Sequence, residues 1–410
     1  MSLRIHVSTL RRHSLMPLLV LLQVMLACAI LCNVLFLTWQ QLAPMLAPSG
    51  VDTADLVLVD HLPSPGRPWT AAEVQAGTEA LREVPGVRAV SAANGLPMIA
   101  NYLYMVAMQG PTGVKLGANG YQGYDLLDTL GLQLVSGRNF RPDEYRDIGT
   151  DQGKGTLEPV IITQSMARQL FGKASPLGGV LRAPGDHKDP GWQVVGVVRH
   201  LLRNQVGMAT RGRADNTVLL PQRVAKTSWL FYAVRVDPSM RQAALRGIRK
   251  ALQRQFGALL PVGTKPRAEF YAVHRAAVFK SRRAALWMFA GVALTVVIVT
   301  VIGIMGLTGF WVQKRTRQIG IRRALGARRV DILRYFLVEN ALIVGLGVVL
   351  GMALAYVGNA WLMHAYELSR LPWTYLPYGA LLMLLLGQLA VLSPALRAAR
   401  VPPVVATRSV

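Results

Sequence analysis

The stretch QKRTRQIGIRRALGARRVDILRYFLVEN, residues 313–340, carries eight Lys or Arg residues and only two acidic ones. Both of its flanks are apolar: no Asp, Glu, Lys or Arg lies between Arg283 and Lys314, nor between Glu339 and Glu367. A membrane-spanning helix needs about 20 consecutive apolar residues, and each flank is longer than that. The stretch is therefore predicted to be a basic loop that joins two membrane helices.

Two further windows lack these charged residues, one between Arg12 and Asp52 and one between Arg370 and Arg397. The 410-residue chain is 52% hydrophobic, with a mean hydropathy of +0.33, which is more apolar than a soluble domain usually is. We expect a multi-pass α-helical membrane protein with four transmembrane helices. These helices are predicted at residues 15–38, 284–312, 338–362 and 374–396.

The first span allows a second interpretation, because it follows a basic start and contains Ala-Cys-Ala at residues 27–29. A signal peptide, including one of the lipoprotein type, would be cleaved near this point. Its apolar region runs to Leu37, however, which exceeds the 7–15 residues usual for secretory signals. We therefore favour an uncleaved anchor, and we interpret Cys28 and Cys32 as small apolar residues buried in it.

The distribution of basic residues predicts the orientation, because short cytoplasmic loops are enriched in Lys and Arg. Three segments outside the spans are basic: the N-terminus (residues 1–14), the loop 313–337 and the C-terminus (residues 397–410). We expect the protein in the inner (plasma) membrane. All three basic segments are then expected on its cytoplasmic side. Residues 40–266 then form a large extracytoplasmic domain.

This extracytoplasmic domain is predicted to be mixed α/β. A capping box of Thr70 and Glu73 begins a helix at residues 70–84. Alternating or continuous apolar runs predict the strands, and amphipathic runs predict the other helices. The strands are expected at residues 87–92, 159–163, 191–201 and 229–236, the helices at 164–171 and 238–256, and an inserted second lobe at about 95–158.

No proline lies between Pro266 and Pro372, so a helix can run from Arg267 into the second span. Residues 267–283, the first part of this helix, would form a stalk. The helix would extend roughly 35 Å beyond the membrane. The alternative is a helix that breaks near residues 280–283.

Sequence motifs for catalysis are missing. The nearest match to a phosphate-binding loop, GTDQGKGT at residues 149–156, has the wrong spacing, and no H-E-x-x-H or G-x-S-x-G motif occurs. We therefore expect no catalytic, cofactor-binding or metal-binding residues and no enzymatic activity. Glu339 enters the third span only at its inner edge, and we expect it to pair with an Arg of the preceding segment, which disfavours an ion-coupled carrier.

Small residues recur along two spans. Gly303 and Gly306 lie in the second span, and Gly347 and Gly351 lie four residues apart in the third. Such residues let helices approach closely in lipid. They are candidates for helix packing, either within the chain or between two chains.

The basic loop itself divides at Gly326. Residues 315–325 are predicted to form a short helix with Ile321 and Leu325 on one face, and Gly326 can adopt the left-handed conformation that ends it. A second helix then begins, with a stripe of apolar residues that leads into the third span. The loop would thus lie on the membrane surface as an amphipathic elbow. The simpler interpretation is that its charges only fix the topology.

This stretch resembles the cytoplasmic motif of MacB/FtsX-type ABC transporter permeases. PALRAARVPP (residues 394–403) resembles the C-terminal motif of the same family, and residues 158–181 and 192–201 resemble its periplasmic core domain. Two positions depart from the family pattern: Gln318 stands where Glu is usual, and Pro402 where Asp is frequent. The chain is not expected to carry a fused ATPase domain.

The resemblance implies a permease that forms a homo- or heterodimer and binds a separate cytoplasmic ABC ATPase, which holds the ATP. The elbow would transmit movement of the ATPase to the outer domain, and a membrane-fusion or periplasmic partner is possible; no nucleic acid is expected. The alternative is an FtsX-like regulatory scaffold that controls cell-wall hydrolases or antibiotic sensing. The residues expected to couple to the ATPase are Arg317, Ile319, Gly320, Ile321, Arg322, Arg323, Leu325 and Gly326.

Overall fold

The computed structural model describes residues 15–99, 104–148, 156–185, 190–203, 214–366 and 371–400. The predicted cytoplasmic N-terminus, most of the predicted cytoplasmic C-terminus and Pro402 lie outside these residues, and most of the segment 149–156 does too. The chain divides into two compact units, which are described separately. One, the membrane unit, comprises residues 1–43 and 281–410, and the other, the outer unit, comprises residues 44–280.

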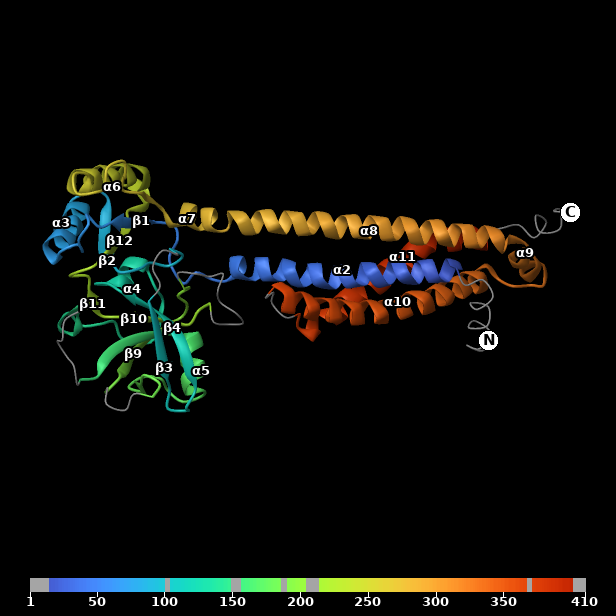
Figure 1. Cartoon of the computed structure of the whole chain (residues 1–410), viewed down its shortest axis with the longest axis horizontal. Helices are drawn as coiled ribbons and strands as arrows, with labels where there is room; N and C mark the ends of the chain where they lie inside the picture. Colours follow the sequence, from blue (N-terminus) through green and yellow to red (C-terminus); the bar gives the residue numbers. More distant parts are fainter. Residues whose placement is uncertain are drawn as a thin grey trace. The chain divides into compact units, whose positions relative to one another are not determined.

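The membrane unit is built from long helices (Figure 1). Four helices among the described residues are long and apolar enough to cross a membrane, and they coincide with the four predicted spans. Each runs a few residues beyond its apolar part, since polar flanking residues continue the helical turn. The bounds are α2 Leu15–Leu46, α8 Lys280–Lys314, α9 Thr316–Ala324, α10 Arg329–Tyr366, η4 Trp373–Tyr375 and α11 Leu376–Ala399.

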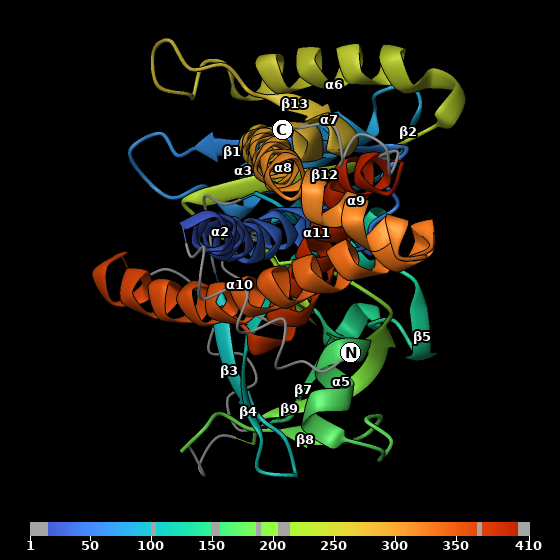
Figure 2. The same ribbon diagram turned by 90° about the vertical axis from the view of Figure 1, so that its right-hand side faces the viewer.

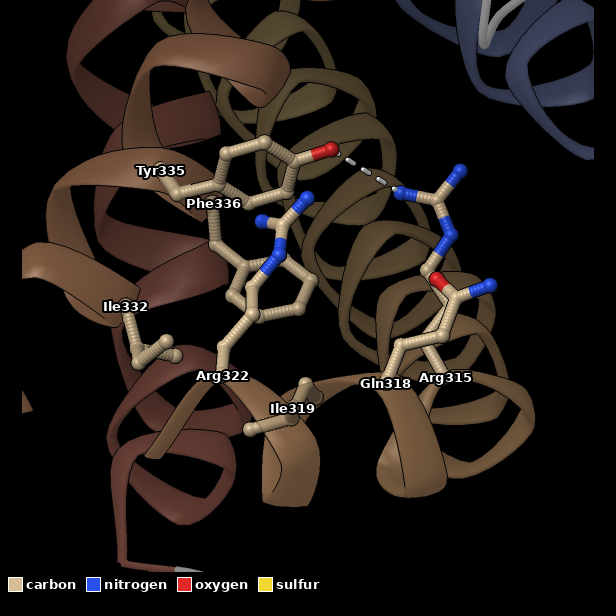
Figure 3. A pocket seen from close by; sticks show the side chains of 7 residues that line it. All are labelled: Arg315, Gln318, Ile319, Arg322, Ile332, Tyr335 and Phe336. Carbon is tan, nitrogen blue, oxygen red and sulfur yellow. Dashed lines mark hydrogen bonds between the residues drawn. The ribbon is translucent and has the colours of Figure 1, made fainter. Parts of the chain in front are cut away.

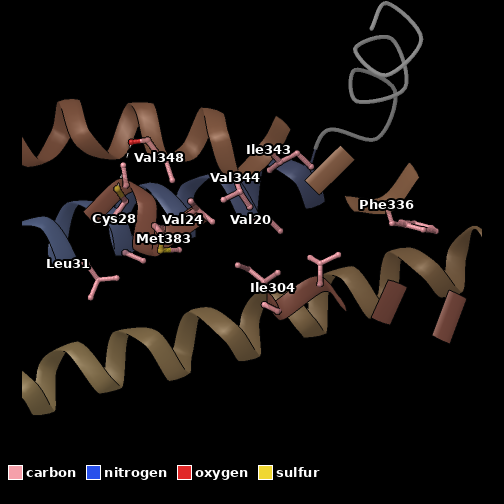
Figure 4. Packing of buried hydrophobic residues seen from close by; sticks show 14 of the residues in the cluster. Val20, Val24, Cys28, Leu31, Ile304, Phe336, Ile343, Val344, Val348 and Met383 are labelled. Carbon is pink, nitrogen blue, oxygen red and sulfur yellow. Dashed lines mark hydrogen bonds between the residues drawn. The ribbon is translucent and has the colours of Figure 1, made fainter. Parts of the chain in front are cut away.

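Helix α2 supplies much of the core of this unit. Val24, Cys28 and Cys32 are fully buried along one of its faces, and both thiols are free. They belong to a hydrophobic cluster that also contains Val344 from α10 and Met383 from α11 (Figure 4). The cysteines are therefore buried small residues, as predicted, and they pack the bundle.

The first sheet of the outer unit has the strand order β13-β1-β12-β2 and is antiparallel throughout. Helices α3 and α6 pack against it over a continuous apolar core (Figure 1). The predicted capping box is present, because Thr70 and Glu73 bond each other's backbone N–H groups at the start of α3. The bounds are β1 Leu56–Pro63, α3 Ala71–Arg82, β2 Val87–Ala93, β12 Trp229–Val236, η3 Pro238–Met240, α6 Arg241–Phe256 and β13 Ala268–Phe270.

The second sheet has the order β3-β4-β10-β7-β9-β5, and β8 pairs with β9. Strands β6 and β11 pair in parallel as a separate two-stranded sheet. The bounds of the elements in this part of the outer unit are β3 Met105–Gln109, β4 Lys115–Gln122, α4 Leu126–Leu130, β5 Leu134–Gly137, η1 Pro142–Glu144, β6 Arg146–Asp147, β7 Glu158–Thr163, α5 Gln164–Phe171, β8 Val180–Leu181, β9 Trp192–Val198, β10 Thr217–Leu220 and β11 Gln222–Arg223. The predicted end of the inserted lobe near residue 158 is wrong. Strand β10 pairs in parallel with β4 about 100 positions earlier in the chain, so the lobe extends to about residue 220.

The predicted stalk helix also begins too early. Residues 268–270 form β13, which pairs with β1, and the helix starts only at α7, Tyr271–Val278. Phe279, 4% exposed, then interrupts the helix for one residue before α8 begins. Its side chain belongs to the apolar core of the outer unit, and this burial accompanies the interruption. An unbroken helix from residue 267 is therefore incorrect, and the interruption lies one residue before the alternative break point.

Candidate coupling elbow

The elbow connects the end of α8 to the start of α10, and α9 lies between them (Figures 1 and 2). The hydroxyl of Thr316 donates to the carbonyl oxygens of Val312 and Gln313, which holds the turn after α8. Gly326 has φ +96°, the left-handed conformation that the sequence predicted. The carboxylate of Asp331 accepts the backbone N–H of Arg328 at 2.9 Å, so the start of α10 is capped.

A buried ion pair joins the two ends of the elbow. Arg315 Nη1 lies 3.2 Å and 3.3 Å from the two carboxylate oxygens of Glu339, and 3.3 Å from the hydroxyl of Tyr335. The side chain of Arg315 is 11% exposed, and that of Glu339 is 1% exposed. The Arg315 guanidinium also lies 4.5 Å from the centre of the Trp311 ring. The predicted pairing of Glu339 with a preceding Arg is confirmed, and it fastens the end of α8 to α10.

The two faces of α9 differ. Ile319 is 5% exposed and packs with Ile332 and Phe336 in the apolar cluster of the membrane unit, and Gly320 is buried beside it. In contrast, Ile321 is half exposed and Leu325 is 83% exposed. The exposed face thus offers apolar residues for contact with another molecule.

Two of the basic residues of α9 also have exposed side chains. Arg317 and Arg322 are exposed, and no salt bridge is formed by either of them within the part of the chain that the structure describes. The side chain of Arg323 lies outside the described residues. The exposed face thus combines apolar and cationic groups, and the role of the predicted coupling residues stays a prediction.

A small open pocket lies between α9 and the first turns of α10 (Figure 3). Its floor is apolar, and its rim carries two guanidinium groups and one amide. The guanidinium of Arg322 lies 4.9 Å from the centre of the Tyr335 ring. The elbow pocket is lined by Arg315, Gln318, Ile319, Arg322, Ile332, Tyr335 and Phe336.

Two family models match the chain. The MacB-like periplasmic core domain matches residues 26–251, more than half of the chain, and the FtsX-like permease C-terminal domain matches residues 290–403. The chain belongs to the MacB/FtsX-type ABC transporter permeases. The elbow is therefore the segment between the second and third membrane helices of a permease, and the outer unit corresponds to a periplasmic core domain.

Relatives of this permease differ in how much of their length it covers. The ABC transporter permease YknZ of Bacillus subtilis is 27% identical over 337 residues, which are 80% of this chain and 77% of that protein. The macrolide export ATP-binding/permease protein MacB of Chromobacterium violaceum is 28% identical over 242 residues, 57% of this chain and 34% of MacB. MacB of Escherichia coli is 25% identical over 290 residues, which are 68% of this chain and 41% of that protein.

Two solved structures are similar to the permease. One is the extracellular domain of YknZ, with a TM-score of 0.34, 17% identity, and coverage of 52% of this chain and all of that one. The other is the periplasmic region of MacB from Actinobacillus actinomycetemcomitans, with a TM-score of 0.37, 13% identity, and coverage of 58% and 98%.

The glycines predicted to pack helices have different surroundings in the permease. A Cβ atom at Gly303 would lie 2.2 Å from the Gln23 amide nitrogen, one at Gly347 would lie 2.9 Å from Val24, and one at Gly351 would lie 2.7 Å from the Cβ of Cys28. A Cβ at Gly306 would meet nothing within 4 Å. The structure thus places the first three against α2, and Gly306 faces open space in the single chain.

Amide side chains within the spans form hydrogen bonds that were not predicted from the sequence. Gln23 on α2 donates to the carbonyl oxygen of Val299 on α8 at 3.0 Å, and Asn340 on α10 donates to that of Gly387 on α11 at 3.1 Å. Such hydrogen bonds hold helices together in lipid. A search for Asn and Gln inside apolar windows finds both positions but not their contacts, because the partners lie on other helices.

Proposed function

We propose that this permease couples a separate cytoplasmic ABC ATPase to movement of its periplasmic core domain. The observation that carries the proposal is the elbow, in which the buried Arg315–Glu339 pair joins α8 and α10. Arg317 and Ile321 on α9, and Leu325 directly after it, have exposed side chains. A force on α9 would pass to both helices because the ion pair links them.

The exposed face suits a protein partner. Arg side chains can bind carboxylates through two parallel hydrogen bonds, and neighbouring apolar groups gain free energy when a partner removes them from water. Leu325, at 83% exposed, is the most exposed of the large apolar side chains that the structure describes in the elbow. The ATP-binding function in the names of the MacB relatives supports an ATPase as the partner.

The proposed orientation places the elbow and both termini in the cytoplasm, because the elbow is the most basic loop between spans. We also propose that the permease works as a dimer and binds no cofactor of its own. ATP would be bound by the partner subunit.

The test uses Gly326→Pro and Ile321→Asp in the full-length permease, co-expressed with its ATPase. Proline removes the left-handed conformation at Gly326, and aspartate places a charge in the proposed interface. Both variants are expected to insert normally, whereas the ATPase that co-purifies with Ile321→Asp should fall about tenfold. ATP hydrolysis in the Gly326→Pro complex should lose its dependence on the permease.

Val262→Asp is the matched control, since Val262 is fully exposed in the outer unit. As in Ile321→Asp, a carboxylate replaces an aliphatic side chain. It should leave both measurements unchanged. If both elbow variants bind and stimulate the ATPase as the unmodified permease does, the elbow is not the coupling element.

A further inference from the structure

We propose that the elbow pocket binds the phosphate group of an anionic phospholipid. This lipid site would lie on the permease alone, so it adds to the proposed function without requiring the ATPase. Three features carry it: the charge balance of the pocket, the apolar nature of its floor, and its place beside the ends of two membrane helices.

The charge balance favours an anion. Two guanidinium groups, those of Arg315 and Arg322, line the pocket. The carboxylate of Glu339 neutralises only the first, at 3.2 Å and 3.3 Å. In the described part of the chain, Arg322 forms no salt bridge, and its guanidinium lies over the Tyr335 ring. One positive charge of the pocket is therefore left without a partner carboxylate.

Gln318 keeps the pocket open to an anion. Its side chain lies on the rim next to Arg315 (Figure 3). The amide is neutral and offers two N–H donors, whereas a carboxylate at this position would compete for the same guanidinium groups. Arginine binds phosphate oxygens well because its planar fork can donate two parallel hydrogen bonds.

The floor favours a lipid over a free anion or an acidic protein side chain. Ile319, Ile332 and Phe336 are each at most 5% exposed and belong to the same apolar cluster as the buried residues of the membrane spans. Their membership of that cluster sets the pocket beside the hydrocarbon region, so the acyl chains of a phospholipid can stay in the bilayer while its phosphate reaches the rim. A free anion or a carboxylate from a soluble protein has no acyl chains to place there.

The pocket also lies at the level expected for headgroups. Arg315 directly follows the last residue of α8, and it stacks on Trp311, an aromatic residue at the end of an apolar span. Tryptophan and arginine at such positions mark the boundary between hydrocarbon and headgroups. Basic pockets between membrane helices on the cytoplasmic side are known sites for anionic headgroups.

The experiment measures binding to the purified full-length permease in neutral detergent, without ATPase, by native mass spectrometry. The probes are dioctanoyl phosphatidic acid, dioctanoyl phosphatidylglycerol, dioctanoyl phosphatidylcholine and inorganic phosphate. The two anionic lipids should bind more tightly than phosphatidylcholine. Arg322→Ala should weaken their binding about tenfold, because one charge-assisted hydrogen bond is lost.

Gln318→Glu is the second variant, because it changes the charge of the rim while keeping the side-chain shape. It should weaken anionic-lipid binding as well and leave phosphatidylcholine binding unaltered. Arg334→Ala is the matched control: Arg334 is exposed on α10, carries the same charge and does not line the pocket. It should bind lipid like the unmodified permease. Thermal unfolding of each variant shows whether it has folded.

Three results would overturn the proposal. Equal weakening by Arg322→Ala and Arg334→Ala would mean that lipid responds only to the total positive charge. Inorganic phosphate binding as tightly as the anionic lipids would identify a free-anion site. Unchanged lipid binding by both pocket variants, together with loss of ATPase co-purification, would identify a protein contact and would leave the proposed coupling function standing.

Discussion

At the scale of single residues, Glu339 is the group whose environment matters most in the membrane unit. A carboxylate that is 1% exposed is stable only when a positive charge and hydrogen bonds compensate for the lost hydration. The sequence offered eight basic residues nearby. In the structure the partner among them is Arg315, which directly follows α8 and lies within 3.2 Å of Glu339 on α10.

Removing one member of this ion pair should destabilise the protein. Arg315→Met removes the Arg315 guanidinium from the buried carboxylate of Glu339, and a loss of ~3–5 kcal/mol of stability is expected. The double variant Arg315→Met with Glu339→Gln should recover part of that loss, because no buried carboxylate remains. Thermal unfolding of the three proteins in the same detergent measures this. A single variant that is as stable as the unmodified protein would show that the pair contributes nothing.

Glu73 in the outer unit should respond to acid. Hydrogen bonds from Arg67 and from the backbone of Thr70 lower the pKa of Glu73 to about 2. A group with a lowered pKa in the folded state stabilises that state above its ordinary pKa, and the contribution disappears as the pH falls toward 2. Its size is modest, because the Arg67 side chain is half exposed.

Glu73→Gln should therefore lower the unfolding temperature of the full-length protein at pH 7 and make no difference near pH 2. The comparison is made by circular dichroism at a series of pH values. Glu83→Gln serves as the control, since Glu83 is exposed at the other end of α3 and forms no salt bridge among the described residues. A constant difference between Glu73→Gln and the unmodified protein at every pH would contradict the expectation.

At the scale of elements, α2 and α10 pack closely because α10 presents glycine where α2 approaches. A Cβ at Gly351 would lie 2.7 Å from the backbone oxygen of Met25 as well as from Cys28. Backbone atoms of a packed helix yield little, so one added methyl group forces the helices apart. Gly345, on the same helix, has nothing within 4 Å of its Cβ position.

The pair Gly351→Ala and Gly345→Ala tests this packing with the same chemical change. Both substitutions gain helix propensity, so the difference between them reports only the contact with α2. We expect Gly351→Ala to be less stable than Gly345→Ala by about 1–3 kcal/mol, as overpacked core positions usually are. Reversible unfolding in mixed micelles measures the difference, and equal stabilities would mean that α2 can move aside freely.

At the scale of the whole molecule, the proposed topology separates the elbow from the outer unit by the membrane. Two exposed positions report on it: Val262, which is fully exposed in the outer unit, and Leu325, which is exposed in the elbow. The native cysteines, Cys28 and Cys32, are buried and free, so we expect them to contribute little background labelling.

In intact cells, a membrane-impermeant maleimide should label Val262→Cys and spare Leu325→Cys. Both should be labelled after the membrane is made permeable, while the unmodified protein stays unlabelled in either state. Labelling of Leu325→Cys in intact cells would reverse the proposed orientation. The result does not depend on any partner of the permease.

The sequence by itself determined the spans, the capped start of α3 and the turn at Gly326, because each depends on neighbouring residues and on solvation by water or lipid. Tertiary structure alone decided that β10 joins β4, that residues 268–270 form a strand and that Arg315 is the partner of Glu339. These features depend on pairings between distant segments. Their stability comes from contacts that no local pattern of residues encodes.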